Sequence, residues 1–309
     1  MIDLVIITYN GKELTKNAIE SALKNTFSPS KIIIVDNNSS DGTVEYIKNL
    51  FPQVEIISLT KNLGYGTASN IGVKEAIAPY VVISNNDVLF PVVFFEKLES
   101  LINKIGGIFG VIGFQQIYPD GSFQNSFGDF HTVKSALMDV FLVSLLKLRF
   151  RKLRWKFGYR KVRKVDYVDG AVICVNKNVF DKVGGFDEDF FFYSEEVDLC
   201  KRMRESGFDV LMDETNEVIH YRGQGKNRIG LSVDKVPTFV KSRAIYCEKH
   251  LSNLSAFLYL RFEAIFYKEL SFLMKFKNKI SKKVLSEQIF INDLISKEFW
   301  KISAKFNYK

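Results

Sequence analysis

The sequence Tyr80-Val81-Val82-Ile83-Ser84-Asn85-Asn86-Asp87-Val88 places four apolar or aromatic residues directly before a polar cluster that ends in a carboxylate. A short, uninterrupted run of this kind is typical of a strand buried on both faces of a parallel sheet. Open α/β sheets bind their ligands outside the carboxyl ends of such strands. Asp87, beside two amides and a serine, would suit a hard divalent cation that bridges phosphate oxygens. A polar turn that merely ends a strand would explain the same residues.

Three more strand-like runs precede this one, and segments with helical spacing of their apolar residues separate them. The runs cover residues 2–8, 31–35 and 54–59. This order predicts an α/β fold with a mostly parallel, doubly wound sheet. Each run ends in a polar or glycine-rich cluster, centred on Tyr9, Asp36, Asn62 and Asp87. Because the carboxyl ends of parallel strands share one edge of a sheet, we expect these clusters to converge in a nucleotide crevice.

Composition and short patterns exclude several classes of protein. The chain has 309 residues, 47% hydrophobic and 25% charged, as expected of a globular protein with one large domain and an appendage. Its three cysteines are too few and too widely spaced for a disulfide framework or a zinc site, which indicates a reducing compartment. We expect neither a secretory signal nor a membrane-spanning helix. Gly64-x-Gly66 lacks the third glycine of a dinucleotide fingerprint, and no P-loop occurs.

The middle of the chain is less regular. A helix is expected at residues 94–105, a strand at residues 108–117 and a tight turn at residues 119–122. No clear periodicity follows until residue 147, which predicts a long loop near an acceptor. A strand over residues 165–175 would carry Asp169-Gly170-Ala171.

Residues 186–200 form the second informative segment, with a helix expected to begin near Ser194. Glu195 and Glu196 fall in its first turn, where a helix dipole favours negative charge, so they could be ordinary surface residues. The functional interpretation is a general base, because sugar transfer with inversion needs a carboxylate opposite the leaving group, as in inverting hydrolases. His220 follows a short strand and is either a structural residue or a metal ligand, since manganese tolerates imidazole.

Four motifs together resemble those of the nucleotide-sugar glycosyltransferases of family 2, above all the bacterial rhamnosyltransferase-like members. They are Ile6-Ile7-Thr8-Tyr9-Asn10, Ile34-Val35-Asp36-Asn37-Asn38-Ser39-Ser40-Asp41-Gly42-Thr43, Asn62-Leu63-Gly64 and Asn85-Asn86-Asp87. The resemblance implies a single, Rossmann-like, nucleotide-sugar-binding domain of the A-type glycosyltransferase fold, with a mostly parallel mixed sheet. That catalytic domain would span residues 1–235, with a nucleotide-binding half at 1–117 and an acceptor half at 118–235. Residues 236–309 would form a basic helical extension.

The resemblance also implies roles for individual residues. The donor would be held by Thr8, Tyr9, Asn10, Asp36, Asn38, Asn62, Gly64, Asn85 and Asn86. The divalent metal, Mg²⁺ or Mn²⁺, would be bound by Asp87 and His220. The acceptor side would include Asp169, Gly170 and Asp198. Residues 193–199 resemble the family's Glu-Asp-x-Asp motif, which makes Glu196 the expected catalytic base and Glu195 its rival.

Two positions depart from the family's pattern. Asn85 stands where the usual Asp-x-Asp motif has its first carboxylate, which bears on how tightly the metal is bound. Glu196 stands where the usual base is an aspartate, which is one methylene shorter.

Positive charge is concentrated in two segments. Residues 147–164 hold ten Lys or Arg and no acid, and residues 236–309 carry a net charge of +8. Because the net charge of the whole chain is also only +8, the rest of the chain has a net charge of −10 and is acidic. Basic segments interleaved with aromatic residues favour binding to an anionic membrane surface. Single-stranded nucleic acid is a weaker alternative, and a solvated helix face would also explain the tail.

These features together predict a metal-dependent inverting glycosyltransferase. It would move a sugar, with rhamnose the best guess, from a dTDP- or UDP-linked donor to a lipid-linked or polysaccharide acceptor of a bacterial cell-surface glycan. A polyprenyl-diphosphate-linked acceptor and a peripheral position on the inner face of the cell membrane follow from the same resemblance. The alternatives are a non-catalytic nucleotide-sugar or glycan-lipid binding protein and, less favoured, a basic RNA-associated protein.

Overall fold

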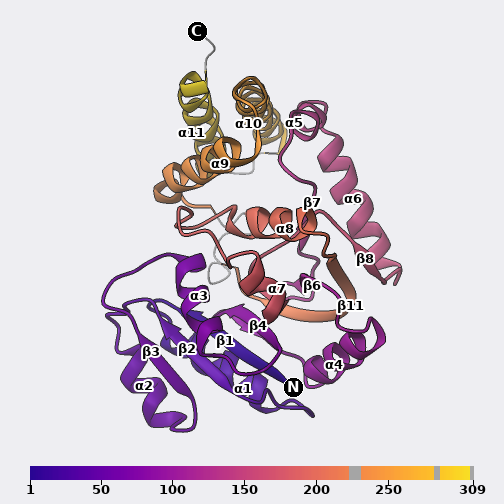
Figure 1. Cartoon of the computed structure of the whole chain (residues 1–309). Helices are drawn as coiled ribbons and strands as arrows, with labels where there is room; N and C mark the ends of the chain where they lie inside the picture. The colour runs from indigo at the N-terminus through magenta and orange to yellow at the C-terminus, as the bar shows by residue number, and fades with distance from the viewer. Residues whose placement is uncertain (223–230, 282–285, 307–309) are drawn as a thin grey trace. The chain divides into compact units, whose positions relative to one another are not determined.

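The computed structural model describes residues 1–222, 231–281 and 286–306, and divides the chain into two compact units (Figure 1). The sheet unit contains residues 1–128, 157–191 and 195–228. The helical unit contains residues 129–156, 192–194 and 229–309. Residues 129–156 thus belong with the carboxyl-terminal helices, a different division from the expected boundary at residue 235.

The amino-terminal half of the sheet unit has the predicted alternation of strands and helices (Figure 1). Its strands, parallel and in the order β3-β2-β1-β4, are β1 (Ile2–Thr8), β2 (Ile32–Asp36), β3 (Glu55–Ser58) and β4 (Tyr80–Asn85). The connecting helices are α1 (Lys12–Leu23), α2 (Thr43–Leu50) and α3 (Tyr65–Glu75).

The central strands are apolar throughout because helices cover both faces of the sheet. Leu4 and Ile6 of β1 are fully buried in one cluster with Ile19 of α1. Val5 points to the opposite face. There a Cβ added to Gly72 of α3 would lie 2.3 Å from Cγ1 of Val5. Glycine at this position therefore allows α3 to pack closely on the sheet.

The second half of the sheet unit extends the same sheet. Its strands are β5 (Val88–Leu89), β6 (Val111–Ile117), β8 (Val162–Lys164), β10 (Val172–Asn176) and β11 (Val210–His220). The sheet order is β3-β2-β1-β4-β10-β6-β11-β5, with β8 paired to β11. Because β10 runs antiparallel to β4 and β6, the sheet is mixed. The helices are α4 (Phe94–Lys104), α7 (Lys177–Lys182) and α8 (Glu195–Glu205). The predicted α/β fold class is confirmed.

The strand predicted over residues 165–175 is broken. Tyr167–Val168 forms β9, which pairs with β7 (Phe127–Gly128), and β10 begins at Val172. Between them the backbone N–H of Ala171 donates to Oδ1 of Asp169 at 3.0 Å. This local turn diverts the backbone from the strand ladder and exposes the carbonyl of Gly170 to other partners.

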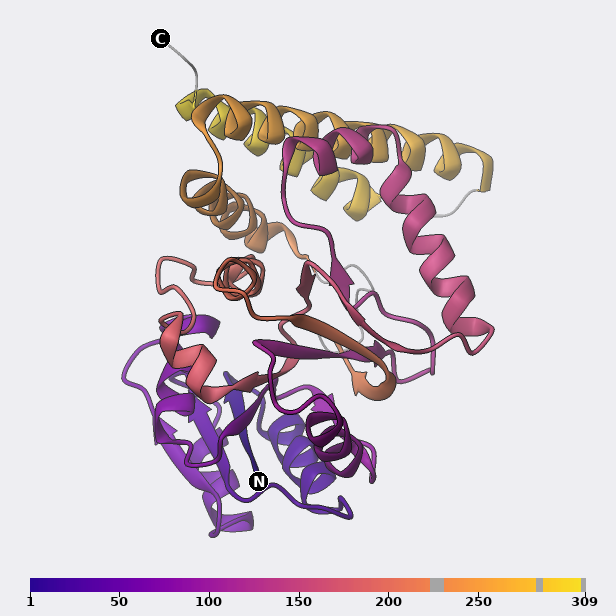
Figure 2. The same cartoon turned by 45° about the vertical axis from the view of Figure 1, so that its right-hand side comes forward.

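The helical unit corrects the long loop predicted before residue 147. Thr132 and Ser135 form a reciprocal capping box that starts α5 (Val133–Val140), and α6 (Val143–Lys156) follows. The other helices of the unit are α9 (Val236–His250), α10 (Asn253–Ser281) and α11 (Ser286–Ser303). Helices α10 and α11 lie side by side, and α5 packs on α10 (Figure 2).

Several aromatic residues of the tail form the core of the helical unit. Tyr259 and Leu260 are buried, and Phe257, Phe262 and Tyr267 pack against the same cluster. The hypothesis that the tail presents these side chains to a membrane is therefore wrong for these residues. No helix in the described part of the chain combines the length and the apolar character needed to cross a membrane.

Candidate active site

The ends of the parallel strands bring together the polar residues predicted for the donor. In the strand register Thr8 lies opposite Asp36, and Ile7 lies opposite Asn85. Asn86 Nδ2 donates to Thr8 Oγ1 at 3.0 Å and to Thr15 Oγ1 at 3.2 Å. These bonds tie the loop after β4 to β1 and α1. The predicted convergence at this edge of the sheet is thus observed.

Asp36 has one carboxylate oxygen without a hydrogen-bond partner in the described structure. Its Oδ2 accepts a hydrogen bond from the backbone of Ser39 at 3.0 Å. Its Oδ1 is buried and has no hydrogen-bond partner within the described residues. Asn10 and Asn38, with φ of 50° and 70°, shape the loops on either side. A buried acceptor without a donor is costly, so Asp36 is suited to a donor group of a bound nucleotide.

The loop after β3 is attached to the segment that precedes α8. Gly64 has a φ of 85°, and a Cβ there would lie 2.1 Å from the carbonyl oxygen of Phe191. That oxygen accepts a hydrogen bond from the backbone of Tyr65 at 3.0 Å. Asn62 Oδ1 accepts from the Gly64 backbone at 3.0 Å, and Asn37, buried, bonds to both Leu63 and Gly64. The loop therefore requires glycine at position 64.

Asp87 and His220, the predicted metal ligands, lie side by side. His220 Nε2 is 3.3 Å from Asp87 Oδ1, and pairing of β5 with β11 holds the two together. Two ligands on neighbouring positions of an octahedral ion, with bonds of roughly 2.1 Å, are about 3 Å apart, so this separation fits a divalent ion. Within the described ranges no group of three or more His, Cys, Asp or Glu side chains is placed to hold a metal. A pair of ligands fits an ion that completes its shell with water and substrate phosphates.

Gln116, which the sequence analysis did not single out, links the metal ligands to Asp169. Its Oε1 lies 2.8 Å from His220 Nδ1, and its Nε2 donates to Asp169 Oδ1 at 3.1 Å. Because a carbonyl oxygen can only accept, Nδ1 of His220 carries a proton and donates it to Gln116, and Nε2 is the ring nitrogen that faces Asp87. The sequence feature that could have pointed to Gln116 is the polar pair Gln115-Gln116 inside an otherwise apolar strand.

Asp169 is held as a carboxylate. Burial raises the pKa of this group, but the positive charges of Arg222 and His220 and the hydrogen bonds from Gln116 and the Ala171 backbone outweigh burial. The pKa of Asp169 is therefore below its ordinary value. Asp169 also orients the turn that carries Gly170.

Glu195 and Glu196 begin α8 next to that turn. A Cβ on Gly170 would lie 3.2 Å from Cβ of Glu196, and the Gly170 carbonyl accepts from Tyr65 Oη at 2.6 Å. Glu195 is buried, and its Oε2 lacks a hydrogen-bond partner in the described structure. Burial, and then the negative charges of Glu196 and Asp169, raise the pKa of Glu195 well above its ordinary value. Because burial disfavours ionisation of Glu195, half-buried Glu196 is the better candidate for an ionised base.

The family model for glycosyl transferase family 2 matches residues 3–166, just over half of the chain. The chain belongs to this family. It is 25% identical over 245 residues to an N-acetylglucosaminyl-diphospho-decaprenol L-rhamnosyltransferase of Mycobacterium tuberculosis, covering 74% of this chain and 78% of the relative. It is also 25% identical over 229 residues to the rhamnosyltransferase WbbL of Escherichia coli K12, covering 72% and 83%.

A solved structure supports the fold of this family 2 glycosyltransferase. The mannosyltransferase PcManGT of Pyrobaculum calidifontis, solved in complex with GDP-Man and Mn²⁺, matches 98% of this chain and 85% of its own. The TM-score is 0.58 at 12% identity. The likeness confirms the A-type glycosyltransferase fold and is too distant to assign a substrate.

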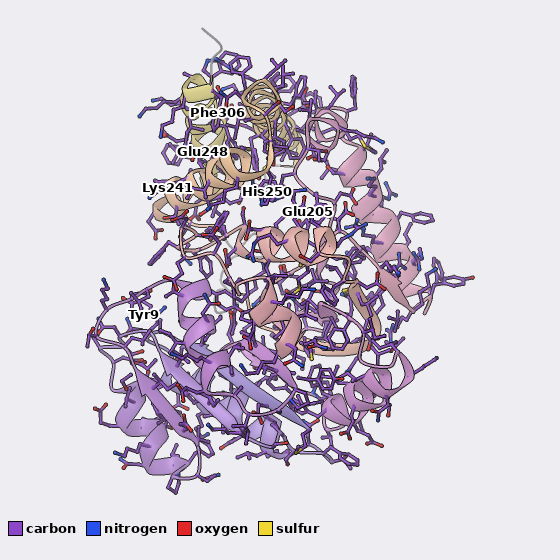
Figure 3. All side chains as sticks on the ribbon, in the orientation of Figure 1. Tyr9, Glu205, Lys241, Glu248, His250 and Phe306 are labelled. Carbon is purple, nitrogen blue, oxygen red and sulfur yellow. The ribbon has the colours of Figure 1, made fainter. Side chains whose placement is uncertain are left out.

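Two predicted site residues of this glycosyltransferase, Asp198 and Tyr9, differ in their surroundings: the first is held in an ion pair and the second is exposed. Asp198 is buried and paired with Arg202, at 2.8 Å from Nε and 2.6 Å from Nη2. Arg202 in turn donates to the carbonyls of Val183 and Gly185, so this pair fixes α8 to the preceding loop. An acceptor role for Asp198 stays a prediction. Tyr9, labelled in Figure 3, is about half exposed.

Proposed function

We propose that the chain is an inverting glycosyltransferase that moves a sugar from a nucleoside-diphosphate donor to an acceptor hydroxyl. The observation that carries the proposal is the series of contacts from Asp87 through His220 and Gln116 to Asp169. This series joins the candidate metal ligands to the turn against which Glu196 packs. The groups that would stabilise the leaving group and activate the acceptor therefore belong to one connected part of the sheet unit.

The leaving group would be handled by Asp87 and His220. Their separation and their oxygen and nitrogen donors fit a divalent ion. Mg²⁺ or Mn²⁺ held there would neutralise the charge that develops on the departing diphosphate. Gln116 would keep the His220 ring in the orientation and tautomer that ligation needs.

The nucleoside and sugar would be held by the loops after β1, β2, β3 and β4. The unpaired Oδ1 of Asp36 would accept a hydrogen bond from the ribose or the base. The exposed ring of Tyr9 is available to pack on the base. The remaining donor contacts would come from Thr8, Asn10, Asn38, Asn62, Gly64, Asn85 and Asn86.

The acceptor would be activated by Glu196. As a carboxylate it would take the proton from the attacking hydroxyl, on the face of the sugar opposite the leaving diphosphate. Neutral Glu195 would avoid the repulsion that two adjacent carboxylates create. Asp169 and Gly170 would shape the acceptor side of the site.

The names of the relatives suggest the substrates. Two relatives named as rhamnosyltransferases support rhamnose, carried by dTDP or UDP, as the donor sugar. The relative named for a diphospho-decaprenol substrate supports a polyprenyl-diphosphate-linked acceptor for a cell-surface glycan such as O-antigen, capsule or exopolysaccharide. The enzyme would then act as a peripheral protein on the inner face of the cell membrane.

The proposal can be tested by screening nucleotide sugars with Mn²⁺ for thermal stabilisation of the protein and then for hydrolysis. One dTDP- or UDP-linked sugar should stabilise the protein and be hydrolysed slowly in the absence of acceptor. Transfer to a synthetic polyprenyl-diphosphate glycan, analysed for anomeric configuration, should give the inverted product. Stabilisation without hydrolysis or transfer would instead indicate a non-catalytic binding protein, and a retained configuration would refute inversion.

A further inference from the structure

Helix α6 of the helical unit has an unusual surface. None of its residues, Val143–Lys156, is buried, and this helix is described completely. Cations alternate along it with apolar residues that remain in solvent, of which Leu146 and Phe150 are each 65% exposed. The helix contains six Lys or Arg and no acidic residue. Burial within the described part of the chain therefore does not account for the apolar side chains of this helix.

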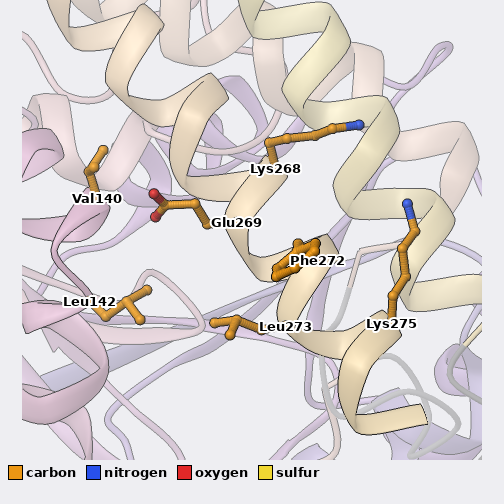
Figure 4. Close-up of a pocket in the computed structure, with 7 residues that line it drawn as sticks. All are labelled: Val140, Leu142, Lys268, Glu269, Phe272, Leu273 and Lys275. Atoms are coloured by element: carbon orange, nitrogen blue, oxygen red, sulfur yellow. The ribbon is translucent and has the colours of Figure 1, made fainter. Parts of the chain in front are cut away.

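The apolar surface continues from the start of α6 onto α10. A cavity of about 450 Å³ lies between the α5–α6 corner and α10 (Figure 4). Val140 and Leu142 line one side of this cavity, and Phe272 and Leu273 line the other together with the carboxylate of Glu269, the one acidic residue among the described residues of the lining. Phe141 at the corner is 71% exposed. The cavity shows that the corner and the end of α10 are neighbours, which their sequence positions do not reveal.

The corner face is defined as the exposed or half-buried apolar side chains of the α5–α6 corner, of α6 and of the end of α10, namely Phe141, Leu142, Leu145, Leu146, Phe150, Phe272, Leu273 and Phe276. Phe272 and Phe276 are exposed by 68% and 61%. Large exposed apolar patches on a protein mark a surface that binds a partner. Lys268 and Lys275 also line the cavity, and their ammonium groups pair with Asp293 of α11 (Figure 4).

The charges around the corner face select the partner. Of the cations on α6, Lys147 and Arg151 pair with Asp129, which precedes α5, whereas Arg149 and Lys152 are exposed beside Phe150. An apolar face bordered by cations complements a bilayer with anionic headgroups, since aromatic and aliphatic side chains enter the interface and cations stay at the headgroups. A second copy of the chain would bring two basic helices together, which charge repulsion opposes. Bases of a single-stranded nucleic acid would stack on the four phenylalanines of the face and would leave its four leucines without an apolar partner, whereas a bilayer interior accommodates both.

We infer that the corner face and helix α6 form the membrane-binding surface of the protein and that its partner is an anionic lipid bilayer. The inference deepens the proposed membrane location and rests on that part of the proposed function. The membrane contact is thereby assigned to a defined surface and not to the whole tail, because the buried aromatic residues of the tail form the core of the helical unit. A lipid-linked acceptor in the same bilayer would thereby be concentrated near the enzyme.

The experiment is sedimentation of the full chain with vesicles of phosphatidylcholine, with and without phosphatidylglycerol. The double variant Arg149→Gln/Lys152→Gln should lower partitioning onto the anionic vesicles about 30-fold, since each cation near the surface is worth roughly 1 kcal/mol. Phe150→Ser and Phe272→Ser should each lower it about tenfold or more, as expected for loss of a buried aromatic side chain. Phe27→Ser, which removes a 51%-exposed phenylalanine of the sheet unit, is the matched control and should leave partitioning unchanged.

Thermal melting and donor hydrolysis of each variant separate this inference from the proposed function. All substituted side chains are exposed, so melting temperatures and hydrolysis should match the wild type. Unchanged partitioning of the α6 and α10 variants, or equal binding to neutral and anionic vesicles, would overturn the inference. Variants that dissociate a dimer while vesicle binding persists would assign the face to self-association and would overturn it as well. If the protein binds vesicles but hydrolyses no donor, the transferase proposal is refuted and the membrane inference is not.

Discussion

His220 Nε2 lies 3.3 Å from Oδ1 of Asp87, while Gln116 holds the other ring nitrogen of His220. This arrangement predicts that Gln116→Leu weakens metal binding. Without its acceptor at Nδ1, the imidazole can change tautomer or rotate, and loss of such an outer contact typically costs about 10–100-fold in metal affinity. Titration of Mn²⁺ in the presence of nucleoside diphosphate, followed by electron paramagnetic resonance, measures this directly.

The matched control is Gln124→Leu. Gln124 is also a buried glutamine, but it donates to the backbone carbonyl of His220 and does not touch the ring. Its replacement should reduce stability and leave Mn²⁺ affinity within about threefold of wild type, well short of the loss expected for an outer contact to a ligand. Equal losses of affinity in both variants would show that Gln116 acts through general stability.

Asp87→Asn tests the metal ligand itself. The amide retains the shape of the side chain and the backbone contact from Tyr221 to the residue 87 carbonyl, so the fold should persist. Loss of the carboxylate should abolish the dependence of nucleotide-diphosphate binding on Mn²⁺ or Mg²⁺. Isothermal titration with and without metal gives the answer. A variant that binds nucleotide with unchanged metal dependence would show that another residue holds the ion.

The nucleotide edge of the sheet was predictable because its residues sit at strand ends. Asp36 and Asp87 each follow an apolar run, and the geometry of parallel strands alone brings such ends together. Gln116 was not predictable, since its role depends on β6 lying beside β11 and on the broken strand that presents Asp169. The burial of Tyr259 in the tail was not predictable either, because a composition of aromatic and basic residues does not show which aromatic side chains other helices cover.

The core of the helical unit contains a titratable pair. Burial raises the pKa of Glu263 to about 7, and a hydrogen bond with Asp139, whose pKa is also raised, contributes in the same direction, while Arg243 opposes it. Folded protein thus holds a proton on Glu263 that the unfolded chain releases near pH 4.5. The stability contributed by this proton is complete below about pH 4.5 and is lost as the pH rises through about 7.

Glu263→Gln should remove this loss, because glutamine resembles the neutral acid and can still donate to Asp139. The free energies of unfolding of the variant and the wild type should agree below about pH 4.5. Above pH 7 the variant should be more stable, by up to about 3 kcal/mol. Urea denaturation across this pH range measures the difference. Equal pH dependence of the two proteins would show that Glu263 is ionised in the folded state.

The most direct test of the central claim is turnover and donor affinity of Glu196→Gln beside Glu195→Gln. Glutamine cannot accept the proton of the acceptor, so Glu196→Gln should lower turnover by roughly 10²–10⁴ while donor affinity stays near that of the wild type. Burial raises the pKa of Glu195 and so disfavours its ionised form, and glutamine resembles the neutral acid, so Glu195→Gln should be milder. Near-normal turnover of Glu196→Gln would contradict the account, and an inactive Glu195→Gln beside it would make Glu195 the base.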